Sequence, residues 1–95
     1  MDSVLSLLGL IYRAKKMYLG ETNLDNIKSV QYLFIASDTS LKSKERYLKK
    51  CAYYNIPYNT NYSQEQLSSA IGKTNVKVIG INDSGFTKSI LNKLK

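Results

Sequence analysis

The sequence predicts an α/β protein, a three-layer α/β/α sandwich around a small mixed sheet of about four strands. Helix-like and strand-like patterns alternate along the 95 residues, and such alternation places helices on both faces of a sheet. Gln31 to Ser37 (QYLFIAS) is almost continuously apolar, as expected for a strand buried on both faces. Val76 to Ile81 gives a second strong strand. No repeat or linker divides the chain, so we expect one domain over residues 1–95.

The remaining elements follow from local patterns of apolar spacing and helix caps. Asp2 or Ser3 is a suitable N-cap for a first helix whose apolar residues recur every three or four positions. Pro57 indicates an edge strand, because proline cannot donate to a neighbouring strand. Ser63 and Gln66 form a capping box. We expect helices over 4–16, 21–29, 41–55, 63–71 and from about 84 onward, with short strands over 17–19 and 56–58.

The third and last helices should each bury one apolar face. In the last helix, Asp83 or Ser84 is the candidate N-cap, and the residues expected inside are Phe86, Ile90 and Leu94. The inward-facing residues expected in the third helix are Leu41, Leu48, Cys51, Ala52 and Asn55. A cysteine on such a face behaves as inert core, so we do not expect Cys51 to be a nucleophile.

The stretch Ala70 to Thr74 (AIGKT) ends as a nucleotide-binding P-loop ends. A P-loop also needs a glycine five positions before Gly72, and that position holds Leu67. The order is also reversed, since the tripeptide leaves a helix and enters a strand. The sequence therefore favours a simpler interpretation, in which Gly72 ends a helix and residues 73–75 form an exposed loop.

The charge distribution limits the classes of partner. The net charge is +7, and the excess lies in residues 42–95, because residues 1–41 carry four bases and four acids. A basic surface suits a polyanion such as nucleic acid, although a lysine surface that only aids solubility fits the composition equally well. One cysteine and no histidine disfavour a disulfide and a metal site. We expect no membrane association and a cytoplasmic location.

Catalysis is not expected, because there is no histidine and the seven acids are scattered. We therefore predict neither catalytic residues nor a cofactor. The basic run KSKERYLKK, residues 42–50, is more typical of a solvated helix face than of a phosphate-binding one. Four tyrosines gather near the predicted edge strand. Tyrosines beside lysines can stack on bases, but half-burial at a sheet edge is the interpretation that the pattern favours.

Several strings along nearly the whole chain carry a family resemblance. They are LLGLIYRAKK (7–16), LFIASDTS (33–40), KKCAYYNIPY (49–58), AIGK (70–73) and VIGINDSGF (78–86). With this element order, the chain resembles the ribosomal protein L seven Ae superfamily, and most closely its small bacterial YlxQ-like branch. The resemblance implies an α/β/α sandwich and binding to kink-turn RNA, a sharply bent helix with tandem sheared G·A pairs.

The resemblance also implies two RNA-contacting segments. The first follows the pattern Gly, any residue, Asn, Glu, two residues, Lys. Gly20 matches its glycine, while Thr22, Asn23 and Asn26 stand at the Asn, Glu and Lys positions. The second segment is the loop after Gly72. The candidate RNA-binding residues are Gly20, Glu21, Thr22, Asn23, Asn26, Lys28, Gly72, Lys73, Thr74 and Asn75.

These observations predict a non-enzymatic protein that binds structured, kink-turn-like RNA as a monomer. Ribosomal RNA, an mRNA leader and the ribosome are the candidate partners. Free amides at the start of the second helix, neutral side chains there and two lysines would make the contacts. The alternative is a protein-interaction module of the same fold that has lost specific RNA binding, which the substituted Glu and Lys positions favour.

Overall fold

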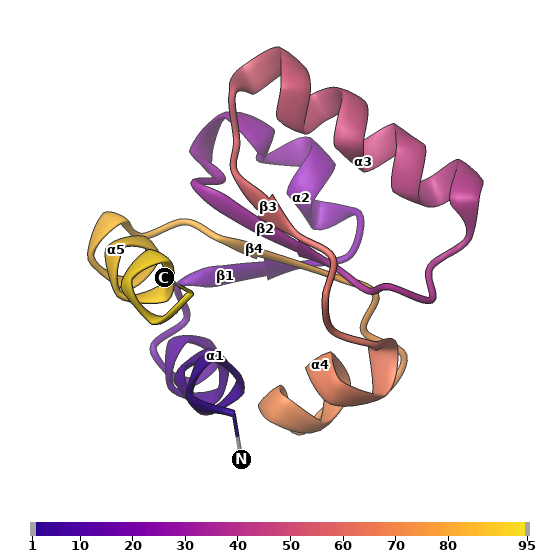
Figure 1. The fold of residues 1–95 in the computed structure, drawn as a ribbon. Helices are drawn as coiled ribbons and strands as arrows, with labels where there is room; N and C mark the ends of the chain where they lie inside the picture. Colours follow the sequence, from indigo (N-terminus) through magenta and orange to yellow (C-terminus); the bar gives the residue numbers. More distant parts are fainter. Residues whose placement is uncertain (1, 95) are drawn as a thin grey trace.

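The computed structural model describes residues 2–94 as a four-stranded sheet covered by helices (Figure 1). The strand order is β1-β4-β2-β3, in which β2 and β3 are parallel and the other two pairs are antiparallel. The predicted three-layer sandwich with a mixed sheet is therefore confirmed. In chain order the elements are α1 (Ser3–Arg13), β1 (Met17–Leu19), α2 (Thr22–Asp25), the 3-10 helix η1 (Ile27–Ser29), β2 (Tyr32–Ile35), α3 (Leu41–Tyr54), β3 (Tyr58–Asn59), α4 (Gln64–Ile71), β4 (Val78–Ile81) and α5 (Ser84–Lys93).

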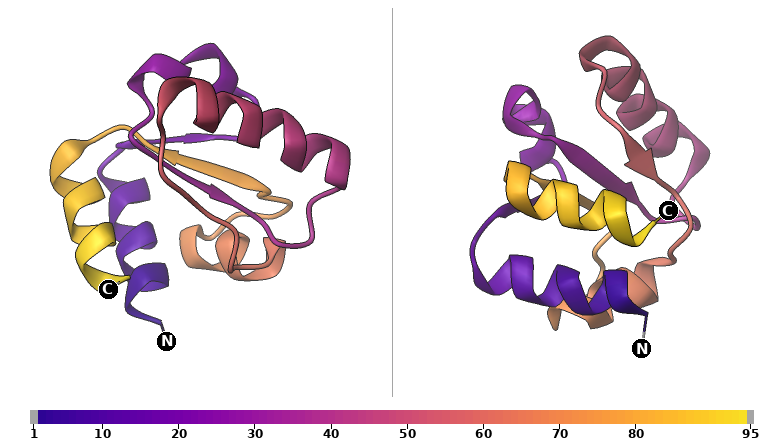
Figure 2. Two further views of the ribbon diagram at one scale, coloured as in Figure 1. Left: turned by 45° about the horizontal axis from the view of Figure 1, so that its top comes forward. Right: turned by 60° about the vertical axis from the view of Figure 1, so that its left-hand side comes forward.

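Two groups of helices cover the two faces of the sheet (Figures 1 and 2). Successive side chains of a strand point to opposite faces. In β2, Tyr32 and Phe34 therefore pack with α1, α4 and α5, whereas Leu33 and Ile35 pack with α2, η1 and α3. All residues of β2 and β4 are buried, which explains why both strands read as continuous apolar runs.

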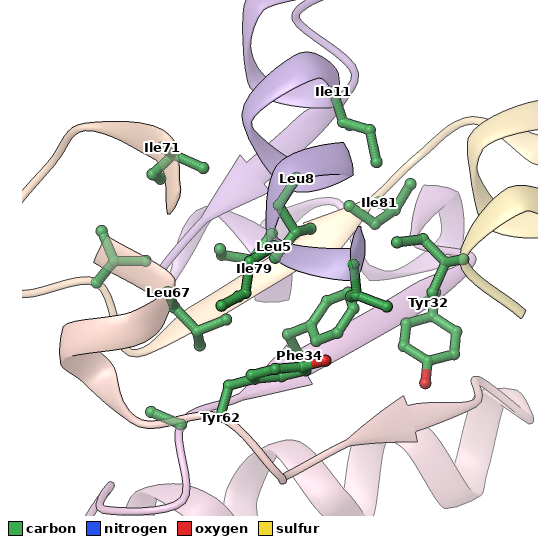
Figure 3. Close-up of a cluster of buried hydrophobic side chains, with 14 residues drawn as sticks. Leu5, Leu8, Ile11, Tyr32, Phe34, Tyr62, Leu67, Ile71, Ile79 and Ile81 are labelled. Carbon is green, nitrogen blue, oxygen red and sulfur yellow. The ribbon is translucent and has the colours of Figure 1, made fainter. Parts of the chain in front are cut away.

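The core under α1, α4 and α5 is centred on Phe34 (Figure 3). The Phe34 ring lies 5.1 Å from the Tyr32 ring and 6.1 Å from the Tyr62 ring, centroid to centroid. The Tyr62 hydroxyl donates to the Asp2 carboxylate at 3.0 Å, and Asp2 is the N-cap of α1. Loss of hydration on burial raises the pKa of Tyr62 to about 12. The phenol therefore stays protonated and ties the start of α1 to this core.

The first two predicted helices are both too long. The first ends at Arg13 rather than at residue 16, because Lys15 adopts a φ of +59° and turns the chain into β1. The second is interrupted at Asn26, which has a φ of −119° and separates α2 from η1. The Asn26 side chain donates to the Thr22 carbonyl at 3.0 Å. An asparagine that bonds the backbone in this way competes with continuation of the helix.

The buried face of α3 is also rotated relative to the prediction. Tyr47 and Cys51, four positions apart, are its buried residues, and Leu41 is 71% exposed. Ala52 and Asn55 are exposed as well, and Leu48 is half-buried. Tyr47 fills the space against η1 and β2, which turns Leu41 and Ala52 away. The expectation that Cys51 belongs to the core is confirmed, and burial raises the pKa of its thiol to about 11.

Most predictions for the last third of the chain are confirmed. The strand after Pro57 covers Tyr58–Asn59 rather than 56–58, and it lies at the sheet edge as predicted. The capping box of Ser63 and Gln66 is present. Asp83 caps α5 and accepts from the Phe86 amide at 2.9 Å. Leu94, expected inside, follows the end of α5 and is 37% exposed.

Candidate nucleic-acid interface

The sheet topology brings three loops together at one end of the molecule. β1 and β2 both run antiparallel to β4, so their carboxyl ends lie beside the amino end of β4. The Gly20 amide, just after β1, donates to the Val78 carbonyl at 3.0 Å. The Ala36 amide, just after β2, donates to the Lys77 carbonyl at 2.7 Å. The β1–α2 turn, the β2–α3 loop and the α4–β4 loop are therefore fixed to one another.

A pocket of about 500 Å³ opens where these loops meet the first turns of α3. It combines residues from four parts of the sequence, which is possible only in the folded chain. Its lining residues are Leu19, Gly20, Glu21, Thr39, Ser43, Arg46, Tyr47, Lys73, Thr74, Asn75, Val76, Lys77 and Val78. Five of the ten candidate residues, Gly20, Glu21, Lys73, Thr74 and Asn75, thus line one surface.

The α4–β4 loop is held in one conformation by its hydrogen bonds. Gly72 ends α4 with a φ of +72°, a left-handed conformation that glycine adopts without strain. The backbone and hydroxyl of Ser68 then accept from the amides of Lys73 and Val76, both at 2.9 Å. Asn75 adopts a φ of +58° between them. The Gly-Lys-Thr tripeptide therefore ends a helix and begins a loop that is held by hydrogen bonds to Ser68.

The pocket lining carries more positive than negative charge. Arg46, Lys73 and Lys77 line it together with one acid, Glu21. Arg46 forms an ion pair with Glu21, and both side chains are more than half exposed, so the pair adds little to stability. The Lys73 ammonium lies 5.7 Å from the centroid of the Tyr12 ring. Two of the three pocket cations thus have protein partners.

The β1–α2 turn differs from the prediction at Asn23. This side chain is fully buried, and its amide nitrogen donates to the carbonyls of Gly20 at 2.9 Å and Tyr18 at 3.2 Å. The backbone amides of Asn23 and Leu24 are bonded to the carbonyls of Gly20 and Glu21. In this structure Asn23 therefore stabilises the turn, and two of the expected free amides at the start of the second helix, those of Asn23 and Leu24, are already used within it.

The remaining candidates of the two segments lie outside the pocket. Thr22 is exposed at the start of α2. Asn26 and Lys28 line a separate hollow of about 450 Å³ around η1. Gly72 shapes the α4–β4 loop without lining the pocket. The interruption of the helix at Asn26 was not predicted from local patterns. Lys28 was expected to form one RNA-binding surface with the α4–β4 loop, but the two line different hollows.

Eight pocket residues were not predicted, and the five of them with polar side chains come mainly from the β2–α3 region. These five are Thr39, Ser43, Arg46, Tyr47 and Lys77. Arg46 belongs to the basic run that was interpreted as a solvated face, and that charge run was the available signal. The Thr39 hydroxyl is buried and has no hydrogen-bond partner among residues 2–94, and the same holds for the Asn23 Oδ1 atom and for the Thr87 hydroxyl on α5.

Neither a membrane segment nor a metal cluster is found in the part of the chain that the structure describes. Between residues 2 and 94, every helix is too short or too polar to cross a bilayer. Within the same range, no three histidine, cysteine or acidic side chains gather as metal ligands would.

Comparison with known proteins places the chain in a family. No protein-family model matches it. An RNA-binding protein YlxQ of Enterococcus faecium is 35% identical over 91 residues, covering 92% of this chain and 86% of its own. The RNA-binding protein YlxQ of Bacillus subtilis (strain 168) is 31% identical over 93 residues, covering 93% and 91%.

Two solved structures have the same fold. A protein of unknown function from Bacillus halodurans C has a TM-score of 0.89 and 33% identity, covering 99% of this chain and 98% of its own. The Giardia lamblia 15.5kD RNA binding protein has a TM-score of 0.75 and 16% identity, covering 96% and 81%. The identity and coverage of the curated relatives show that this chain belongs to the YlxQ family.

Proposed function

We propose that this protein binds structured RNA, without catalysis, through the pocket between the β1–α2 turn, α3 and the α4–β4 loop. The single observation that carries the proposal is the composition of this pocket. Three cations, Arg46, Lys73 and Lys77, are brought together from separate parts of the sequence. The names of the two curated relatives, both called RNA-binding proteins, support the same conclusion.

The chemistry of the pocket suits an irregular RNA more than a plain duplex. Arg46 and Lys77 can bind phosphates, while Ser43 and Thr74 offer hydroxyl groups to base edges or to a ribose 2′-OH. The loop is already ordered, so binding does not have to fix its conformation. A kinked RNA, which presents phosphates and unstacked base edges together, is the class of ligand that we infer. A ribosomal RNA or an mRNA leader on the cytoplasmic ribosome would provide it, bound by a monomer.

The alternative is a protein-interaction module that has lost specific RNA binding. The observation that favours it is the first RNA-contacting segment, because Asn23 is buried and Asn26 lies outside the pocket. Such a module would hold its partner mainly by apolar contacts, whose strength depends weakly on salt. Salt dependence therefore separates the two functions.

The test is a titration of the protein with a kink-turn RNA and with a matched plain duplex, each at about 50 and 200 mM salt. With about three phosphate contacts, the affinity should fall about 40-fold between these concentrations. Lys77→Glu and Lys73→Glu should each weaken binding about tenfold and reduce the salt slope by about one. Lys88→Glu, the same charge change on α5 at the other end of the sheet (Figure 1), is the control.

Each outcome of this titration has a definite meaning. Preference for the kinked RNA together with loss of affinity in the two pocket variants supports the proposal. Equal weakening by Lys88→Glu would show a general electrostatic binder without a specific pocket. No binding of the wild-type protein to either RNA, at low salt, would contradict the proposal and favour the protein-interaction module.

A further inference from the structure

The exposed side of α3 continues the charged surface beyond the pocket. At 100° per residue, Arg46, Lys49, Lys50 and Tyr53 fall within about 100° of the helix circumference. All four are exposed. Arg46 lines the pocket, and Tyr53 lies about 10 Å further along the helix axis. A basic stripe therefore leads from the pocket to an aromatic side chain, over a length that corresponds to about three stacked nucleotides at ~3.4 Å each.

Tyr53 is the most exposed of the four tyrosines of this region. It is 79% exposed, whereas Tyr58 is 50% and Tyr62 9% exposed, and Tyr54 packs against the core under α3. The Tyr53 and Tyr54 rings meet edge to face, with centroids 4.8 Å apart and planes at 80°. This contact steadies the Tyr53 ring and leaves at least one of its faces open to solvent. Half-burial therefore accounts for Tyr54 and Tyr58, and burial in the core accounts for Tyr62, whereas neither accounts for Tyr53.

We propose that an unpaired strand of the RNA leaves the pocket along α3 and stacks one base on Tyr53, with its phosphates on Lys49 and Lys50. This inference rests on the proposed function. An open aromatic face next to cations is the arrangement that binds single-stranded nucleic acid without sequence preference. The occupant is RNA because the stripe begins in the pocket and its charges are positive. The ligand class is then a structured RNA with an unpaired extension.

The experiment compares two RNAs that share one structured element, one blunt and one with a short unpaired tail containing 2-aminopurine. The wild-type protein should bind the tailed RNA more tightly and quench the 2-aminopurine fluorescence. Tyr53→Ala should weaken binding of the tailed RNA at least about fivefold, abolish quenching and leave blunt-RNA affinity unchanged. Tyr53→Phe should keep both affinity and quenching, because the ring alone stacks. Lys50→Glu should weaken binding of the tailed RNA more than Lys88→Glu does.

The readouts separate failure of this inference from failure of the proposed function. Wild-type binding that ignores the tail, or a Tyr53→Ala variant that loses blunt-RNA affinity equally, would overturn the stacking site and leave the pocket assignment standing. A wild-type protein that binds neither RNA would overturn both. Thermal unfolding of each variant verifies that the protein is folded, and the high exposure of Tyr53 means that its substitution should leave the melting temperature unchanged.

Discussion

Gly80 allows the β1–α2 turn to pack directly on the sheet. It lies in β4, buried opposite Tyr18 and Leu33, and its α-carbon faces Asn23. A Cβ atom at this position would overlap the Asn23 Oδ1 atom and lie 2.9 Å from its Cγ and 3.3 Å from the Val30 Cγ1. Gly80→Ala should therefore displace Asn23 and disturb the turn that carries Gly20 into the pocket.

The cost of Gly80→Ala can be estimated from these contacts. Displacing Asn23 removes its two hydrogen bonds, to the Tyr18 and Gly20 carbonyls, at about 1 kcal/mol each. Crowding in a packed core adds about 1–3 kcal/mol, and the lower entropy of the unfolded chain returns about 0.4–1 kcal/mol. The free energy of unfolding should fall by about 3 kcal/mol. For a domain of this size, the melting temperature should fall by about 12–24 °C.

Urea unfolding followed by circular dichroism measures this loss, and Asn23→Ala completes a double-mutant cycle. Asn23→Ala alone should cost about 2 kcal/mol for the same two hydrogen bonds. Because it also removes the clash, adding Gly80→Ala to it should cost little more, which gives a coupling of about 3 kcal/mol. Additive costs, or a loss below about 1 kcal/mol for Gly80→Ala alone, would refute the packing explanation.

Two further predictions concern the α4–β4 loop and the core under α3. Ser68→Ala removes the hydroxyl that accepts from the buried Val76 amide, so it should lower the free energy of unfolding by about 1–3 kcal/mol and weaken RNA binding, as urea unfolding and the RNA titration would measure. Burial raises the pKa of the Cys51 thiol to about 11, which favours its neutral form in the folded state. The stability from this shift should be complete below the ordinary thiol pKa and lost as the pH rises through about 11. A Cys51→Ala variant should lack that part of the pH dependence, and the native thiol should react slowly with thiol reagents at pH 8.

The elements that sequence predicted best are those whose signals are local. The capping box at Ser63 and Gln66, the Asp83 cap and the glycine end of α4 each depend on residues within a few positions. The two central strands were identified because burial on both faces makes every position apolar. The interruption at Asn26 was not predicted, because an asparagine in a short polar helix either bonds the backbone or faces solvent. The local pattern does not distinguish these two conformations.

The candidate site could be predicted only in part, since it depends on contacts between distant segments. The expectation that Asn23 offers polar groups to RNA followed from its type and position. Its burial depends on Gly80, which is 57 residues away in the sequence and opens the space that the amide fills. Arg46 was dismissed with its charge run because nothing local distinguishes a solvated cation from one that lines a pocket. Arg46 lies beside the β1–α2 turn because α3 packs against η1 and β2.

The direction of β4 is the feature that creates the pocket. If β4 ran parallel to β1 and β2, the α4–β4 loop would lie at the far end of the sheet, and Gly20 and Lys77 would be separated by the length of a strand. The antiparallel pairing instead joins the Gly20 amide to the Val78 carbonyl and the Ala36 amide to the Lys77 carbonyl. Strand direction has no signature within the strand itself. The Gly-Lys-Thr loop therefore derives its role from this pairing, and any function assigned to it depends on the fold more than on the tripeptide.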